Sequence, residues 1–264
     1  MSRRARRLPT AEQLQLEGVL LAGGLRALLL QLAHPAVGHG VAHHSDFEAD
    51  PLARLRGTLR FVYVVAAGEE DLVRRVARSV GAAHRPVVSG EDAALAYDAR
   101  DAALQLWVAA TIHDTAIRIA ESVWGRLPDA LADELLERDG RLATVLGLPE
   151  GAWPRTRAGF DEAFARASGD LGFDATTVPV VRALVAARST PVWLRVAMPL
   201  LLRATLPTLP TLPGIRPALD PLVPRWVPDL LPAARRLAPA VRLLPPALRR
   251  LPARRILAAA RRET

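Results

Sequence analysis

One long stretch, residues 98–124, constrains the fold of this 264-residue chain more than any other. Apolar residues recur there at intervals of three and four, as on one face of an amphipathic helix. One face carries Leu106, Ala110, His113 and Ile117. The adjacent face carries Trp107, Thr111, Asp114 and Arg118. No stretch shows the strict alternation that a sheet would demand. We therefore predict an all-α fold, with one globular domain of several helices.

Capping residues and helix breakers set the limits of the other predicted helices. Thr10, with Gln13 as its capping-box partner, begins the first helix, and Asp50 followed by Pro51 begins a later one. Residues 34–44 carry a proline and two glycines, so we expect an irregular or kinked passage there. The remaining helices are predicted over residues 11–21, 25–33, 51–67, 69–85, 128–146, 155–167 and 177–188.

The chain changes character at residue 191. Fourteen of its 22 prolines lie from there to the end, so only short helices fit, such as 192–204 and 230–237. The many leucines between these prolines argue against a free linker. We predict three parts: a disordered basic arm over 1–10, a helical domain over 11–190, and a Pro/Arg-rich extension over 191–264 that packs on the domain.

Charge and composition exclude several classes of function. The formal net charge is +8, and the sequence holds neither lysine nor cysteine. A Schiff-base lysine, a P-loop lysine, a thiol nucleophile and a Cys-ligated metal are therefore impossible. Because aromatic residues make up only 5% and no nucleic-acid motif is present, we predict no nucleic-acid partner. The excess arginine lies at the two ends, as in solvated tails or tails near anionic lipid.

The sequence shows no targeting signal. Its basic start is followed by acidic residues and a proline rather than by an apolar segment. Residues 18–41 are apolar, but Arg26, Gln31 and His34 interrupt them, so we predict a buried helix rather than a membrane span. We expect a cytoplasmic protein without signal peptide or transmembrane helix, whose basic C-terminal segment is the candidate for peripheral membrane contact.

Histidines gather beside apolar residues in two places. Four of the six lie in residues 34–44, and His84 projects from the stripe of Leu72, Val76 and Val80 just before a proline. A lone histidine on such a stripe is more often a buried residue with a satisfied hydrogen bond than a ligand. An inward-facing, neutral histidine on a rigid helix also meets the needs of an axial haem ligand.

Three segments together resemble a known family. The segment AHPAVGHGVAHHSDFEADPLARLRGT combines an Ala-His-Pro with a His-Ser pair and an Asp-Pro helix that carries arginine and, four residues on, threonine. AAHRPVVSG and LWVAATIHDTAIRIAESVWG are similar to two further marks of the same family. The family is the catalytic domain shared by MpaB-type oxygenases and latex-clearing rubber oxygenases. The resemblance covers roughly residues 18–190 and, more weakly, the tail.

The resemblance implies a globin-reminiscent helical bundle that holds haem b. It identifies His84 as the proximal iron ligand, and it places Arg54 and Thr58 on the other side of the haem. His34 and His44 match the family marks and are further cofactor-binding candidates. Characterised members cleave carbon–carbon double bonds of isoprenoid chains with dioxygen, so an apolar isoprenoid or lipid substrate is implied.

Two positions depart from the family pattern. Rubber-cleaving members carry a lysine directly before the threonine, where this chain has Gly57. Many relatives carry a histidine in the tryptophan-bearing helix, where this chain has Ala109, and His113 lies one turn further on. We interpret His113 as a histidine at the edge of the core and Asp114 as the partner of Arg118 rather than as an acid–base dyad.

The residues leave two alternatives to a haem oxygenase. The plain roles of Arg54 and Thr58 are a cap or salt bridge and a hydrogen bond to a backbone carbonyl. A non-haem metal enzyme could use His39 and His43, four residues apart, with the acids of the stretch from His34 to Asp50. A non-enzymatic helical protein could dock its basic C-terminal segment on a membrane surface or partner.

Overall fold

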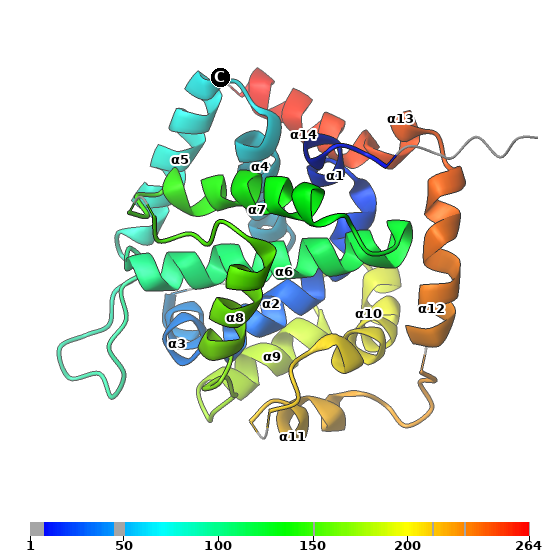
Figure 1. Ribbon diagram of the computed structural model, residues 1–264. Helices are drawn as coiled ribbons and strands as arrows, with labels where there is room; N and C mark the ends of the chain where they lie inside the picture. Colours follow the sequence, from blue (N-terminus) through cyan, green and yellow to red (C-terminus); the bar gives the residue numbers. More distant parts are fainter. Residues whose placement is uncertain (1–7, 45–50, 150, 213, 230, 264) are drawn as a thin grey trace, which may run out of the picture.

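A computed structural model of the protein describes residues 8–44, 51–149, 151–212, 214–229 and 231–263 (Figure 1). Its described residues form no strand, only isolated bridges such as Val88–Asp98, so the predicted all-α fold is confirmed. The α-helices and 3-10 helices (η) are, in order, α1 Ala11–Gln15, η1 Gly18–Gly23, α2 Gly24–Ala33, α3 Pro35–His44, α4 Pro51–Ala67, α5 Glu70–His84, α6 Ala102–Trp124, α7 Asp129–Thr144, α8 Arg157–Ala167, α9 Thr177–Ala186, α10 Val192–Thr205, η2 Leu206–Thr208, α11 Arg216–Leu219, η3 Asp220–Leu222, α12 Leu231–Leu237, η4 Ala238–Leu243, α13 Pro246–Arg249 and α14 Leu251–Arg262.

Helix α6 crosses the middle of the molecule and packs against α2, α7, η1 and η4 (Figure 1). It begins at Ala102 rather than at the predicted residue 98, because the preceding residues form a turn in which the Asp101 N–H donates to the Asp98 carbonyl at 2.9 Å. The Asp101 carboxylate then caps the helix by accepting from the Ala103 N–H at 2.6 Å. The end is fixed by Gly125, whose φ of +83° suits glycine.

The passage through residues 34–44 differs from the prediction. It is a regular helix, α3, whose first residue is Pro35, and the kink is concentrated in His34 with its extended ψ of 121°. Gly38 is needed inside α3 because a Cβ there would lie 2.4 Å from the Leu32 carbonyl oxygen. Gly38 therefore permits close approach to α2, whereas a Cβ on Gly40 would make only ordinary contacts with Val87 and Tyr97 at 3.5 Å, and neither glycine breaks the helix.

The first predicted helix is shorter than expected. The Thr10 capping box is present, with the Gln13 N–H donating to the Thr10 hydroxyl oxygen, but α1 ends at Gln15 and a 3-10 helix follows. The first seven residues of the predicted disordered arm and the predicted Asp50 cap lie outside the described residues.

No single helix in the described part of the chain is both long and apolar enough to cross a membrane. The stretches Gly18–Ala33 and Pro35–His44 reach the required length and composition only together, and they meet at an angle of 99°. Much of α2 is buried inside the protein, with Leu30 and Leu32 both 0% exposed, as expected for a core helix.

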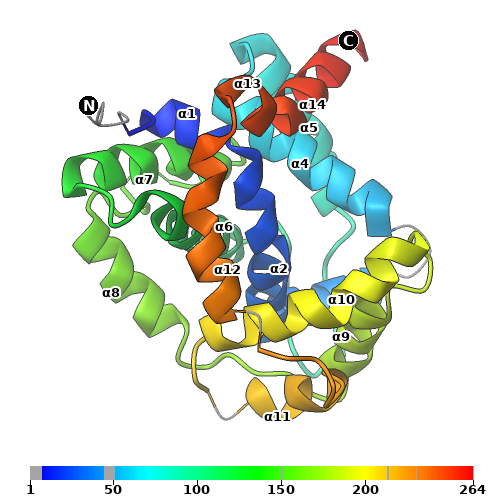
Figure 2. The same ribbon diagram turned by 90° about the vertical axis from the view of Figure 1, so that its right-hand side faces the viewer.

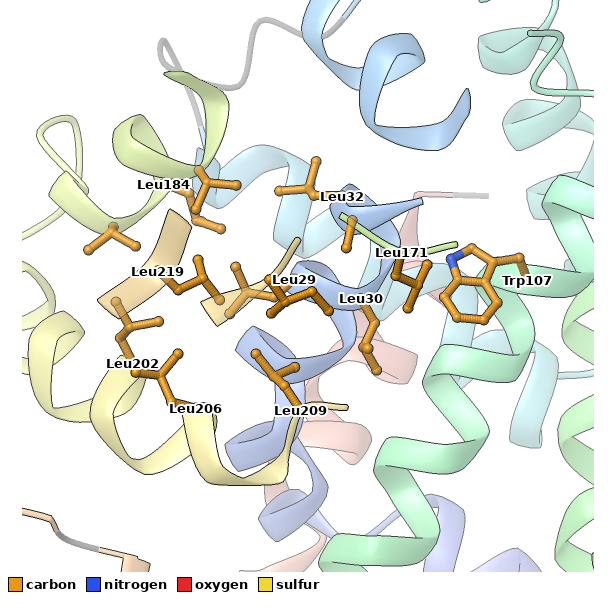
Figure 3. Packing of buried hydrophobic residues seen from close by; sticks show 14 of the residues in the cluster. Leu29, Leu30, Leu32, Trp107, Leu171, Leu184, Leu202, Leu206, Leu209 and Leu219 are labelled. Carbon is orange, nitrogen blue, oxygen red and sulfur yellow. The ribbon is translucent and has the colours of Figure 1, made fainter. Parts of the chain in front are cut away.

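The largest apolar cluster lies where α2 meets the C-terminal segment (Figure 3). Leu29 of α2 lies on the side of Leu202 and Leu206 of α10 and its continuation, and Leu30 lies on the side of Trp107. Fully burying one such leucine stabilises a fold by about 1.5–3 kcal/mol. Residues beyond 191 thus contribute to the core, although the division of the chain at residues 10 and 190 stays a prediction.

Helix α14 returns to the N-terminal half and packs along α4. Its Ala253 and Leu257 are buried in a second apolar cluster. The expected solvated character is wrong for Arg249 and Arg250, which are 9% and 15% exposed and pair with buried Glu17 at 3.4 and 3.0 Å. Arg261 pairs with Glu69 at 2.7 Å but stays 52% exposed. These ion pairs join residues that are about 190 or more positions apart.

Candidate functional site

His84 is the last residue of α5, on the predicted stripe whose Leu72 and Val76 are buried. Its ring is half-buried, and its Nδ1 atom is enclosed without a hydrogen-bond partner among the described residues. Burial lowers the pKa of the imidazole, and the nearby Arg54 charge lowers it further. The ring is therefore neutral near pH 7, as metal ligation requires.

Arg54 comes from the first half of α4 and lies close enough to His84 for their charges to interact. Desolvation lowers the pKa of Arg54, although solvent reaches its side chain. A long side chain can be surrounded by protein atoms along its length and still reach water at its tip. The structure thus brings together the two residues that the sequence assigns to opposite sides of a haem.

Thr58 lies one turn after Arg54 on α4. Its hydroxyl donates to the Arg54 carbonyl oxygen at 3.1 Å, which is the plain role considered for it from the sequence. The oxygen keeps acceptor capacity, and rotation about χ1 can redirect the proton. Its assignment to the distal face of a haem stays a prediction.

The first half of α4 is open, whereas its second half is packed. Tyr63, Val64 and Val65 are 3%, 0% and 1% exposed, but Leu55 is 47% exposed. A Cβ added to Gly57 would meet no atom of the described residues within 4 Å. The same is true of Gly81 on α5, one turn before His84. Both glycines are exposed, so the described residues leave this surface of α4 and α5 open to solvent.

These residues fit a haem. The site offers a neutral histidine whose Nδ1 has no hydrogen-bond partner among the described residues, and a nearby cation whose charge suits a haem propionate. The ring nitrogen that does not bind iron would still need an acceptor, since ligating histidines usually donate their second N–H.

His34 and His44 lie apart from this pair. His34 occupies the corner between α2 and α3, where its ring lies 5.8 Å from that of Trp107. The His34 Nδ1 and the Trp107 Nε1 are both enclosed without a partner in the described part of the chain, and desolvation lowers the pKa of His34. The Nε2 of His44 lies 3.1 Å from the Tyr97 hydroxyl. Their cofactor-binding roles stay predictions.

The described residues do not support the non-haem metal alternative. His39 is paired with Asp174 at 2.6 Å, and the Nδ1 of His43 lies 3.1 Å from the Tyr97 hydroxyl that also meets His44. Over the described ranges, no three histidine or acidic side chains come together as a metal would require. Asp46 and Asp50, the acids named for this site, lie outside the described residues.

His113 is not at the edge of the core, as the sequence suggested, but only 2% exposed inside it. Its Nδ1 lies 2.7 Å from the Asp139 carboxylate, which also accepts a hydrogen bond from the Gln15 amide at 2.7 Å. Nothing in the sequence marked Asp139 or Gln15 as partners of His113. The ring packs edge-on against Phe160. We interpret this group as a structural network.

The predicted Asp114–Arg118 pair is confirmed at 3.0 Å, but Asp114 has a second partner that the sequence did not reveal. Arg26 of α2 lies 2.5 Å from the Asp114 carboxylate, and both side chains are 4% exposed. The only signal was an arginine within an apolar run. This pair ties α2 to α6.

The sequence profile described as "ER-bound oxygenase mpaB/B'/Rubber oxygenase, catalytic domain" matches residues 12–262. The chain belongs to this family. The match extends through the C-terminal segment, where the sequence alone showed only a weak resemblance. Membership of this family indicates an oxygenase-type enzyme with the fold of the MpaB and rubber-oxygenase catalytic domain.

Two relatives of this oxygenase family member are mycobacterial. They are uncharacterized proteins of Mycobacterium bovis (Mb2261) and of Mycobacterium tuberculosis (Rv2237). Each is 36% identical over 183 residues, which cover 67% of this chain and 72% of the relative. No solved structure shows significant similarity to the chain.

One departure from the family pattern has a structural consequence. Ala109, where many MpaB-type relatives carry a histidine, is 3% exposed and belongs to the second apolar cluster. This position on α6 therefore supplies packing and no polar group. His113, one turn on, is committed to Asp139 and does not replace the missing histidine.

Proposed function

We propose that the protein is a haem b-dependent oxygenase that uses dioxygen to cleave or otherwise oxidise an apolar isoprenoid or lipid substrate. The observation that carries this proposal is the buried Nδ1 of His84, which has no partner within the described ranges and lies close to Arg54, in a chain of the MpaB and rubber-oxygenase family. Haem, when bound, supplies the dioxygen chemistry, and the protein supplies ligand, orientation and access.

Each residue of the pair has a separate role in this proposal. His84 holds the haem iron through a neutral ring nitrogen, and the lowered pKa of its imidazole keeps proton competition small near pH 7. Arg54 supplies a positive charge close to His84, which suits a negative group of the cofactor. Thr58 positions a hydroxyl on the same helix face, one turn from Arg54.

The exposed apolar surface of α4 suits an apolar substrate. Leu55 is 47% exposed in the same half of α4 that carries Arg54. The position that is lysine in rubber-cleaving members is Gly57 here, beside which the structure has open space. We therefore propose a smaller or differently shaped alkene than rubber as the substrate.

The proposal is tested with protein purified from haem-supplemented cells. We expect a Soret band, one haem per chain, and oxygen uptake without added reductant when an unsaturated isoprenoid such as squalene is supplied. Oxidative cleavage consumes one dioxygen for each double bond and yields two carbonyl groups, so product carbonyls should equal twice the oxygen consumed. Arg54→Ala should lower haem content or turnover, whereas His39→Gln, outside the site, should leave both unchanged. Protein that takes up no haem would contradict the proposal.

A further inference from the structure

The C-terminal segment combines two surface properties that the rest of the chain lacks. Residues 191–264 hold thirteen arginines against three acidic residues, whereas acidic residues slightly outnumber arginines in residues 1–190. The same segment contributes ten of the fourteen large apolar side chains that are exposed among the described residues. They are Val192, Trp193, Val196, Leu201, Trp226, Leu237, Leu243, Leu244, Leu248 and Leu251.

Two tryptophans of the C-terminal segment are largely exposed to solvent. Trp193 is 70% and Trp226 is 71% exposed, and Val196 on the same helix as Trp193 is 65% exposed. Each tryptophan lies within two positions of an arginine that is also exposed, Arg195 or Arg225. Tryptophan beside arginine is typical of side chains that sit at the boundary between water and lipid.

Helices α12, η4 and α13 also expose leucine and arginine side chains to solvent. Leu237, Leu243 and Leu248 are 69%, 72% and 58% exposed, and Arg235 and Arg236 on α12 are exposed as well. Figure 2 shows α12 on the outside of the molecule, on the side that also presents α10. Helices α10 and α12 contact each other. We call the surface of α10, α12, η4 and α13, together with the exposed Trp226 between η3 and α12, the C-terminal face.

A cavity of about 430 Å³ opens beside this face. Its lining includes Leu243, Leu244, Arg242, Arg249 and the ring of Trp124. The Arg249 side chain is only 9% exposed, and its Nε is enclosed without a partner within the described residues.

The cavity is also electrostatically suited to an anion. Arg249 and Arg250 both face the single carboxylate of Glu17, at 3.4 and 3.0 Å, so one positive charge is left over. Arg242 also lines the cavity, and its Nε donates to the Pro239 carbonyl oxygen at 3.2 Å. An anionic group with an attached apolar chain would find arginine and leucine within one cavity.

We propose that the C-terminal face binds an anionic lipid surface, and that the cavity between Trp124, Arg242 and Arg249 receives a phosphate headgroup. The leucines and tryptophans enter the interface, and the arginines stay at the level of the phosphates. Charge complementarity favours this partner over a second copy of the chain, because two like-charged C-terminal faces repel each other. The proposal goes beyond the oxygenase activity and does not depend on haem.

The test is co-sedimentation of the full chain with vesicles of phosphatidylcholine, alone or mixed with phosphatidylglycerol. We expect binding to the anionic vesicles, weakened by salt, and little binding to the neutral ones. The Arg235→Gln/Arg236→Gln variant should bind roughly thirtyfold more weakly, since each basic residue near an anionic membrane contributes about fivefold. Arg126→Gln/Arg166→Gln, at arginines 70% and 73% exposed outside the C-terminal face, is the matched control and should bind as the wild type does.

A second variant separates docking from simple charge attraction. Trp193→Ser/Trp226→Ser should weaken vesicle binding and abolish the blue shift of tryptophan fluorescence on vesicle addition, while circular dichroism stays unchanged. The proposal is overturned if anionic vesicles do not bind, if the control pair matters as much as Arg235 and Arg236, or if the tryptophan variant only dissociates a homo-oligomer.

Discussion

Replacing Asp114 should destabilise the protein more than replacing any surface acid. The carboxylate joins Arg26 at 2.5 Å, and Arg26 also donates to the Thr115 hydroxyl at 2.9 Å and to the Thr208 carbonyl at 3.1 Å. These contacts connect α2, α6 and the C-terminal segment. With Asp114→Asn, Arg26 stays buried without its anion, and desolvation already lowers its pKa.

The expected cost differs between the two partners. Removing one member of a buried ion pair costs about 3–5 kcal/mol when the other charge is left uncompensated, which describes Asp114→Asn. Arg26→Met leaves Asp114 with Arg118, whose side chain is 56% exposed and can follow the carboxylate. The loss is then closer to that of hydrogen bonds to a charged group, about 1.5–3 kcal/mol.

Urea unfolding followed by circular dichroism measures both losses on the apo-protein. The double variant Arg26→Met/Asp114→Asn should lose less than the sum of the single variants, because the buried charge is gone together with its partner. Asp129→Asn serves as the control, since Asp129 and its partner Arg126 are 74% and 70% exposed. Surface pairs contribute about 0–1 kcal/mol. If Asp114→Asn costs no more than Asp129→Asn, or if the single losses add fully, the buried-pair reasoning is refuted.

Three further outcomes follow from the packing and from the histidines. Gly140→Ala should cost about 1–3 kcal/mol of unfolding free energy in urea, because its Cβ would lie 2.6 Å from the Trp153 ring. Gly81→Ala, with no atom within 4 Å, should instead stabilise the apo-protein by about 0.5–1 kcal/mol in the same assay. Burial lowers the folded-state pKa of His34 and of His84, so below about pH 6.5 the unfolded chain binds protons that the folded one does not. The free energy of unfolding of the apo-protein should therefore fall as the pH drops from about 6.5, and it should fall less steeply in His34→Gln and His84→Gln. If both variants show the wild-type pH dependence, the two histidines do not have lowered pKa values.

Local sequence signals predicted α4 and α5 well. Pro51 fits the first turn of a helix, Gly68 ends one, and Glu70 begins the next with acidic residues, so both helices follow from short-range chemistry. The error at α3 has a long-range cause. Gly38 looked like a helix breaker, but it permits the approach of α3 to the Leu32 carbonyl, which only the folded chain shows.

Most of the buried polar pairs could not be predicted from the sequence. Glu17 pairs with Arg250, Arg26 with Asp114, and His113 with Asp139. These partners are far apart in the sequence, and no local pattern indicates them. The candidate site was easier to predict, because the helical spacing places His84 on the same face as buried Leu72 and Val76. The family resemblance then supplied Arg54, whose proximity the electrostatics support.

Haem binding by His84 is tested most directly by replacing this residue and supplying the missing ligand. Haem is titrated into apo-protein of the wild type, His84→Gly and the matched His39→Gln variant, and the Soret band is recorded. The account predicts one haem per chain with a histidine-type spectrum for the wild type and His39→Gln, a weak and shifted band for His84→Gly, and recovery of the wild-type band when imidazole is added. A His84→Gly spectrum and affinity identical to those of the wild type would contradict it.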